Sequence, residues 1–200
     1  MRRAVLLDMG GVLVELGGEK PFLELLGGNH TRESMWRMWL DSPAVRAHET
    51  GRMETKAFAE AAVAEFGLRI GPEAFLAHFA SWIVGPYEGV HGFLEELSAR
   101  HETAILTNIS AIHTDIVSDY GLFERVRHVF ASHLIGEIKP DRAYFEHVLD
   151  RMNLAPHEAV FLDDNEINAE GARACGIEAH VVRGLAETRE TLARLGFLPG

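Results

Sequence analysis

Five short apolar runs are spaced along the chain, and most of them are separated by stretches whose apolar residues recur at helical intervals. Short runs of branched apolar residues are typical of strands buried on both faces. Strands of this kind are usually parallel and are connected through helices. The predicted strands are Ala4–Leu7, Thr103–Leu106, His128–Ala131, Ala159–Leu162 and Ala179–Val182.

Three of the intervening stretches place several apolar residues on one helical face. Residues three or four positions apart lie on the same side of a helix, so each face can pack against a sheet. Strands and helices in this alternation predict an α/β fold, a Rossmann-like parallel sheet with helices on both faces. The predicted helical faces are Val90, Phe93, Leu94 and Leu97; Ile112, Ile116 and Tyr120; and Phe145, Val148, Leu149 and Met152.

The stretch between the first two predicted strands has helical patterns and no convincing strand. Phe58 and Phe66 share one helical face that ends at Gly67. We therefore predict a small all-helical cap over residues 15–85, inserted after the first strand, with residues 1–14 and 86–200 forming the α/β core. A module in this position belongs above the strand ends, where a lid would act. Pro72 opens a further predicted helix with the apolar face Phe75, Leu76, Phe79, Trp82 and Ile83.

The composition is that of an acidic globular protein. The chain has 200 residues, of which 47% are hydrophobic and 24% charged, and its formal net charge is −11. This charge repels a phosphate backbone, so no nucleic acid partner is expected. Apolar runs stay short of the roughly 18 residues of a membrane span, and the first residues are too few for a signal peptide. We expect a cytoplasmic protein without a membrane partner.

The chain has one cysteine, Cys175, so an intrachain disulfide is excluded. A single cysteine is typical of a reducing compartment. Its setting indicates a helix end that runs into a strand, and we expect a buried structural thiol there.

Asp8 follows the first predicted strand directly, and Gly10 and Gly11 come soon after it. Glycines let the backbone bend tightly or come close to a ligand. In an open α/β sheet, ligands bind just beyond the carboxyl ends of the strands. On this stretch alone, Asp8 is interpreted equally well as a turn residue or as part of a ligand site.

Three later segments carry further candidate residues. Thr107 and Asn108 end the second predicted strand, and Lys139 precedes a proline and a predicted helix. Asp163 and Asp164 follow a strongly apolar strand as an adjacent pair of carboxylates. A bound cation or a raised pKa commonly relieves the repulsion of such a pair. Each segment alone also fits an ordinary turn or a solvated surface.

The order of the four segments, an acid, a hydroxyl, a lysine and an acidic pair, resembles the haloacid dehalogenase superfamily, in its phosphatase-like branch with an inserted helical cap. The resemblance covers nearly the whole chain. It implies that Asp8 is the nucleophile, which forms an aspartyl-phosphate that water then hydrolyses. It also implies that Thr107 hydrogen-bonds the transferring phosphoryl group, that Lys139 neutralises this group, and that Asn108 contributes a backbone N–H.

The resemblance further implies a Mg²⁺ cofactor held by Asp8, the backbone carbonyl of Gly10, Asp163 and Asp164. A cation is needed there because an anionic nucleophile must approach an anionic phosphate. Mg²⁺ prefers oxygen ligands of this kind. The expected activity is that of a phosphoric monoester hydrolase acting on a small phosphorylated metabolite, a sugar phosphate or a similar compound.

Gly10 departs from the family's pattern, because phosphatases of this branch usually carry a second aspartate there as the general acid and base. Three interpretations stay open. The substrate has a good leaving group, or a residue from elsewhere acts as the acid, or the protein binds phosphorylated ligands without turnover. Candidates for the second interpretation are His48, Glu49 and Glu166.

Other functions are weighed against hydrolysis of a phosphate ester. A haloacid dehalogenase would use Asp8 without a metal, and the acidic pair argues against it. A phosphate-binding protein with an impaired site is favoured by Gly10 and opposed by the other retained residues. A phosphomutase depends heavily on the missing acid and ranks below simple hydrolysis.

Several remaining residues have ordinary structural interpretations. We predict Trp36 and Trp39 in the core of the cap and His113 on a helix surface. Arg37 and Arg46 could reach a substrate or could be solvated. Apolar cap helices could pair between two chains, which would give a homodimer.

Overall fold

A five-stranded parallel sheet forms the centre of the protein. The computed structural model describes residues 4–199, and residues 1–3 and 200 of the predicted core lie outside the described residues. The strands lie in the order β5-β4-β1-β6-β7, and every neighbouring pair is parallel. All five predicted runs are strands, with bounds that differ by at most one residue. The strands are β1 (Ala4–Leu7), β4 (Glu102–Thr107), β5 (His128–Ala131), β6 (Ala159–Asp163) and β7 (Glu178–Val181).

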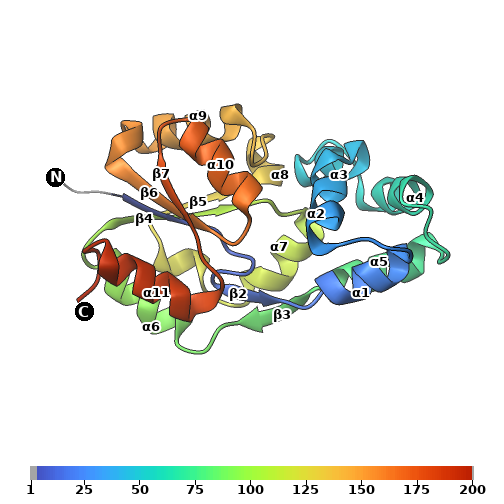
Figure 1. The fold of residues 1–200 in the computed structure, drawn as a ribbon, viewed down its shortest axis with the longest axis horizontal. Helices are drawn as coiled ribbons and strands as arrows, with labels where there is room; N and C mark the ends of the chain where they lie inside the picture. The colour runs from blue at the N-terminus through green and yellow to red at the C-terminus, as the bar shows by residue number, and fades with distance from the viewer. Residues whose placement is uncertain (1–3, 200) are drawn as a thin grey trace.

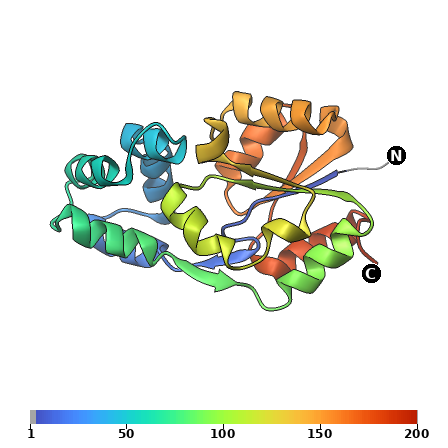
Figure 2. The same ribbon diagram turned by 180° about the vertical axis from the view of Figure 1, so that it is seen from behind.

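Helices cover both faces of this sheet, which confirms the predicted α/β class (Figures 1 and 2). Alternate residues of β1 point to opposite faces, so Val5 and Leu7 join one hydrophobic cluster and Ala4 and Leu6 join the other. Residues of α6 (Val90–Ser98), α7 (Ala111–Ser118) and α11 (Gly184–Arg194) pack in the first cluster. Residues of α9 (Arg142–Met152) and α10 (Glu166–Ala174) pack in the second.

Five further helices lie together at the end of the molecule that is far from both chain termini (Figure 1). They share a hydrophobic cluster of their own, which includes Phe22, Trp39, Phe58, Phe75 and Phe79. That residues 15–85 act as a separate cap remains a prediction. These helices are α1 (Glu19–Leu26), α2 (Arg32–Asp41), α3 (Pro43–Glu49), α4 (Thr55–Glu65) and α5 (Pro72–Ala80).

The expectation that residues 15–85 contain no strand is wrong at both ends of the segment. β2 (Val14–Leu16) and β3 (Ile83–Pro86) form a two-stranded antiparallel sheet. Ile83 therefore lies in a strand, because α5 ends at Ala80. Each strand is too short to show alternation, and the pairing joins residues far apart in sequence, so local pattern carries no signal of it.

The buried face of α7 is turned by one residue from the predicted face. His113 and Val117 are its buried residues, and Tyr120 lies beyond the end of the helix. His113 is therefore not on the surface, and that prediction is wrong. Its Nε2 lies 2.8 Å from the backbone oxygen of Phe79, and the two rings pack 4.1 Å apart. This contact with α5 sets which face of α7 is buried, and the periodicity of the α7 sequence carries no information about it.

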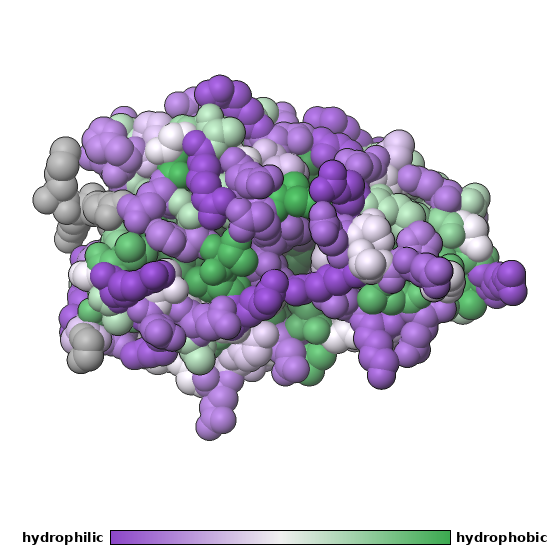
Figure 3. Space-filling model, in the orientation of Figure 1, coloured by the Kyte–Doolittle hydropathy of each residue, from purple (hydrophilic) through white to green (hydrophobic). Residues whose placement is uncertain are grey.

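Short elements complete the fold. They are α8 (Ser132–Ile135) and the 3₁₀ helices at Phe123–Arg125 and Pro156–Glu158. Cys175 follows α10 as predicted, but it is half-buried rather than buried. Hydrophilic residues cover much of the face in Figure 3, with hydrophobic residues exposed between them. Within residues 4–199, no helix combines the length and apolar character that crossing a membrane requires.

Helix α3 and the segment directly after it are fastened to the α/β core at three points. Gly51 packs so closely against α8 that a Cβ would lie 2.5 Å from the backbone oxygen of His133. Arg46 forms an ion pair with Asp141, and the side chain of Arg52 donates a hydrogen bond of 2.8 Å to the backbone oxygen of Gly136. These contacts hold the end of α3 in a set position relative to the sheet.

We expect Gly51→Ala to destabilise the protein more than Gly67→Ala. Both glycines have positive φ angles, 71° and 61°, so alanine is strained at each by about 1–2 kcal/mol. Only at Gly51 does the new methyl also collide with backbone, since nothing lies within 4 Å of a Cβ at Gly67. Urea unfolding should show a loss of about 3 kcal/mol for Gly51→Ala and about 1 kcal/mol for Gly67→Ala. Equal losses would contradict this contact.

Candidate active site

Three of the predicted site residues meet at the carboxyl edge of the sheet. β1 lies between β4 and β6, so the residues that follow these strands become neighbours. Asp8 continues the pairing of β1 with β6, since its backbone N–H donates to Leu162 at 2.8 Å. Thr107 ends β4 and Asp163 ends β6, on either side of Asp8. Parallel pairing therefore brings together side chains that are distant in sequence.

Lys139 joins these strands through its ammonium group. Its Nζ donates to Asp8 Oδ1 at 2.6 Å, to Asp163 Oδ2 at 2.7 Å and to the backbone oxygen of Leu106 at 2.9 Å. The Lys139 side chain is only 1% exposed. Three acceptors match its three N–H donors, so the buried charge is fully hydrogen-bonded.

Asn108 holds the backbone of Lys139 on both sides. Its Nδ2 donates to the Lys139 carbonyl at 2.8 Å, and its Oδ1 accepts from the Lys139 N–H at 2.9 Å. The Asn108 side chain therefore positions Lys139, a contact that its place beside Thr107 did not suggest. The expected contact of its backbone N–H with phosphate remains a prediction.

The two adjacent carboxylates have different surroundings. Asp163 is completely buried, and both of its oxygens accept hydrogen bonds of 3.1 Å from Asn168 Nδ2. The backbone N–H of Asn165 donates a further bond of 2.9 Å to Asp163. The Asp164 side chain is 20% exposed and lines the pocket. Asp163 is therefore held by the protein, whereas Asp164 has only a long contact of 3.5 Å from Arg32 to its Oδ2 and lines the pocket with its carboxylate.

The concentration of negative charge shifts the pKa values of the site. Burial raises the pKa of Asp8 well above the usual range of an aspartate, although the Lys139 ammonium opposes this. Burial and the charge of Asp163 raise the pKa of Asp164 to about 6. Burial alone would lower the pKa of Lys139, but the charges of Asp163 and Asp8 outweigh it and raise that pKa. The site therefore disfavours further negative charge unless a cation is added.

The acidic residues fit a divalent cation. Asp8, Asp163 and Asp164 offer carboxylate oxygens that all lie within 4.8 Å of one another. Lys139 pairs with Asp8 and Asp163, but three ionised carboxylates with one ammonium still have an excess of negative charge. Carboxylate oxygens are ligands that Mg²⁺ prefers. Asp8 and Asp164 carry the free oxygens, and the contribution of the Gly10 carbonyl remains a prediction.

The two glycines that follow Asp8 and Met9 lie close to other side chains. A Cβ on Gly11 would lie 2.6 Å from the Asp164 carboxylate, and the φ angle of Gly11 is 71°. A Cβ on Gly10 would lie 2.8 Å from a terminal methyl carbon of Leu16. The chain therefore approaches its own acidic residue at Gly11, and Leu16 fills the space beside Gly10.

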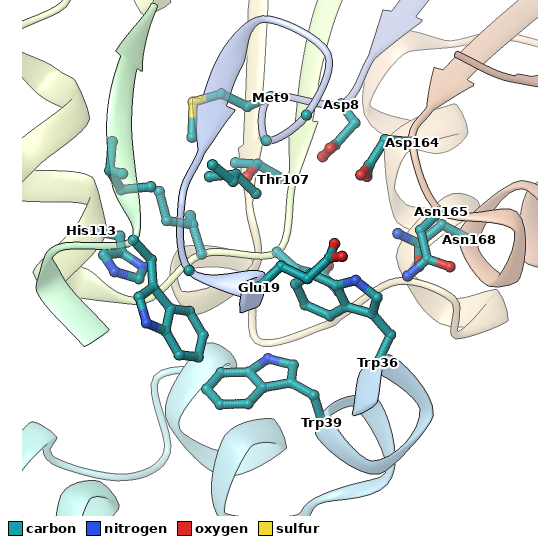
Figure 4. Close-up of a pocket in the computed structure, with 18 of the residues that line it drawn as sticks. Asp8, Met9, Glu19, Trp36, Trp39, Thr107, His113, Asp164, Asn165 and Asn168 are labelled. Atoms are coloured by element: carbon teal, nitrogen blue, oxygen red, sulfur yellow. The ribbon is translucent and has the colours of Figure 1, made fainter. Parts of the chain in front are cut away.

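The polar residues open into a pocket of about 300 Å³. Asp8 and Asp164 lie on one side of it, and the indole rings of Trp36 and Trp39 lie on the other (Figure 4). Trp39 is buried in the hydrophobic cluster of the cap helices, as predicted, and Trp36 packs against this cluster. Both also line the pocket, and the aromatic wall is completed by Phe22, Phe79 and Trp82.

Of the three candidate replacements for an acid at Gly10, only Glu49 lines this pocket. Glu49 is 7% exposed, and its Oε1 accepts a bond of 3.3 Å from Trp39 Nε1. His48 is buried in the cap, with its ring stacked 4.2 Å from that of Phe58. Glu166 is half-exposed and forms an ion pair with Arg173.

Sequence reasoning missed the cations at the mouth of the pocket. Arg32 and Arg183 both line it, and Arg32 lies 3.5 Å from Asp164 and 2.7 Å from Glu19. No spacing in the sequence distinguishes these arginines, because they reach the pocket from the cap and from the loop after β7. Arg37 instead lies on the surface beside Glu33, and Arg46 pairs with Asp141 away from the pocket.

Burial raises the pKa of Glu49 to about 7, and its bond from Trp39 opposes this only in part. A pKa raised on folding stabilises the protein at low pH, and this stability is lost as pH rises through the folded pKa. We therefore expect wild type to lose about 3 kcal/mol more stability between pH 4.5 and pH 8 than Glu49→Gln. Urea unfolding at several pH values measures the difference. Parallel pH dependence of the two proteins would show that Glu49 ionises freely in the folded state.

Comparison with known proteins shows which family the chain resembles. A model of the haloacid dehalogenase-like hydrolases matches residues 2–176. A phosphatase of Mycobacterium tuberculosis is 25% identical over 170 residues, which cover 81% of this chain and 76% of that protein. A sesquiterpene phosphatase of Aspergillus oryzae is 26% identical over 202 residues, which cover 97% of both chains.

The fold also matches a solved structure. A haloacid dehalogenase family enzyme of Bacteroides thetaiotaomicron, in complex with magnesium and inorganic phosphate, has a TM-score of 0.71 and 22% identity. The match covers 92% of this chain and 95% of that chain. The resemblance inferred from the sequence motifs is thereby confirmed. Since the family model spans most of its length, this chain belongs to the haloacid dehalogenase-like hydrolases.

Proposed function

We propose that the protein is a Mg²⁺-dependent phosphatase that hydrolyses a small phosphorylated metabolite through an aspartyl-phosphate on Asp8. The observation that carries this proposal is the buried ammonium of Lys139, bonded to both Asp8 and Asp163 beside a cluster of three carboxylates. A site with the Asp8 carboxylate at the pocket and the Lys139 ammonium bonded to it suits attack on a phosphate dianion.

Asp8 is the proposed nucleophile because it lines the pocket at the edge of the sheet. One of its oxygens accepts from Lys139, and the other is free to attack phosphorus. The ammonium of Lys139 favours the ionised form of Asp8 that the attack needs, and it offsets charge that develops on the phosphoryl group. Thr107 lines the same pocket, where its hydroxyl can donate to a phosphoryl oxygen.

When bound, Mg²⁺ would offset the charge of the phosphate and of the acidic residues. Asp8 and Asp164 are the side chains with oxygens open to it, together with the proposed carbonyl of Gly10. Asp163 acts behind them by holding Lys139, and Asn168 and Asn165 in turn hold Asp163. Such outer contacts fix the orientation of groups that touch the reacting atoms.

We further propose that residues 15–85 act as a cap that binds the alcohol part of the substrate. The aromatic wall of the pocket comes from this segment and faces the acidic edge of the core. Indole and phenyl faces bind apolar surfaces, which sugars and hydrocarbon chains both offer. The phosphatase names of two relatives, one of them a sesquiterpene phosphatase, support an ester of this kind.

We expect Asp8→Asn to lose phosphatase activity by about 10³-fold or more, because an amide is a poor nucleophile. Phosphate release should be measured on sugar phosphates, nucleotides, acyl phosphates, alkyl phosphates and an aryl phosphate. Glu166→Gln is the matched control, since it removes a carboxylate outside the pocket. Full activity of Asp8→Asn would exclude this nucleophile. No turnover by wild type across the set would favour a phosphate-binding protein.

Removal of the metal should abolish turnover, because the acidic cluster then lacks its neutralising cation. We expect EDTA to reduce phosphate release by about 100-fold or more and added Mg²⁺ to restore it. Asp164→Asn should require a higher Mg²⁺ concentration for half-maximal activity, whereas Glu166→Gln should not. Activity on haloacids that survives complete removal of metal would favour the dehalogenase alternative.

A further inference from the structure

The position that would carry a general acid in this site has no side chain to serve as one. Gly10 has no side chain, and Leu16 occupies the space that a Cβ there would need, at 2.8 Å. A proton must nevertheless reach the alkoxide oxygen of an unactivated ester when its bond to phosphorus breaks. Such proton transfer contributes about 10²–10⁴-fold to the rate.

Glu49 is a buried carboxyl group that faces the same pocket as Asp8, Thr107 and Lys139. It is 7% exposed, and its side chain accepts a hydrogen bond of 3.3 Å from the neutral indole N–H of Trp39. Among the ion pairs of residues 4–199, none includes Glu49. A buried carboxylate without a bonded cation is costly, so it is expected chiefly where it has a function.

The fastening of α3 to the core sets the position of Glu49. Glu49 is the last residue of α3. The ion pair of Arg46 with Asp141 lies one turn before it, and the close packing of Gly51 on His133 lies two residues after it. The end of α3 is thus tied to the core that carries Asp8. This attachment holds Glu49 in a fixed position, as proton transfer requires.

We propose that Glu49 is the acid–base residue of this site and takes the role that Gly10 cannot fill. The proposal rests on the phosphatase function proposed above. As Asp8 forms its bond to phosphorus, the ester oxygen leaves with the bonding electron pair and takes the proton of the Glu49 carboxyl. The Glu49 carboxylate then accepts a proton from the water that attacks the aspartyl-phosphate, which frees Asp8 and phosphate and restores the acid.

The surroundings of Glu49 suit both steps. Burial raises its pKa to about 7, whereas the bond from Trp39 and the charges of Lys139 and Arg46 lower it. Glu49 can therefore give and regain a proton near neutral pH. The negative end of α3 also disfavours ionisation of its last residue.

Other titratable residues of the pocket are less suited. His113 has its Nε2 bonded to the Phe79 carbonyl, and burial lowers its pKa, so it does not carry a second proton to donate. Glu19 forms an ion pair with Arg32 at 2.7 Å and is about one-third exposed. Glu49 is the carboxyl group of the pocket that combines burial with freedom from a bonded cation.

The test compares two esters in wild type and Glu49→Gln. Hexyl phosphate has a poor leaving group that needs a proton, and 4-nitrophenyl phosphate has a good one that does not. We expect Glu49→Gln to lower hexyl phosphate turnover by about 10²–10⁴-fold. With 4-nitrophenyl phosphate, a burst of nitrophenol should persist and be followed by slow turnover, because the water step has lost its base.

Matched variants separate chemistry from structure. In Glu49→Gln the amide oxygen still accepts from Trp39, so a purely structural role predicts no change in the ratio of the two esters. Trp39→Phe removes that bond and keeps the acid, and Glu19→Gln removes another carboxyl group of the pocket. Each should lower hexyl phosphate turnover far less than Glu49→Gln does. Gly10→Asp combined with Leu16→Ala should partly restore hexyl phosphate turnover in Glu49→Gln.

The outcomes distinguish the two proposals. An unchanged ratio of esters in Glu49→Gln, with wild type active and Asp8→Asn inactive, would overturn the role of Glu49 and leave the phosphatase function intact. Absence of turnover by wild type on either ester and on the wider set would overturn both. A selective loss on hexyl phosphate with a persistent burst on 4-nitrophenyl phosphate would establish Glu49 as the acid and base.

Discussion

The ammonium of Lys139 is the interaction on which the site depends. It is buried and bonded to Asp8, to Asp163 and to the backbone of β4, so it ties the ends of three neighbouring strands together. Two carboxylates could not be buried side by side without it. A buried ion pair of this kind adds little stability over apolar packing, but removal of one partner is costly. We infer that it is retained for its chemistry.

Excess negative charge explains several other features around Lys139. The pKa values of Asp8 and Asp164 are raised, Arg32 reaches across from α2 toward Asp164, and Asn168 donates to Asp163. The contacts of Arg32 and Asn168 each compensate part of the negative charge, and neither removes it. A bound divalent cation would neutralise the remaining charge. The same cluster is therefore a candidate metal site.

The helices of residues 15–85 contribute a different kind of surface to the pocket. Their aromatic cluster is the hydrophobic core of that segment, and several of its side chains also form the wall of the pocket. Glu49 is the polar exception on this wall. Burial raises its pKa to about 7, so this carboxyl group costs stability at neutral pH.

Local pattern determined the five parallel strands, most helical faces and the identity of the residues at the strand ends, because burial and secondary structure impose short periods on the chain. Motif order was enough to indicate the family. Tertiary structure decided what local pattern does not contain: the pairing of β2 with β3, the turned face of α7, the arginines at the pocket, and the position of Glu49, rather than His48 or Glu166, in the pocket lining. These features depend on contacts between residues far apart in sequence. A short-range hydrophobic pattern carries no information about the energies of such contacts.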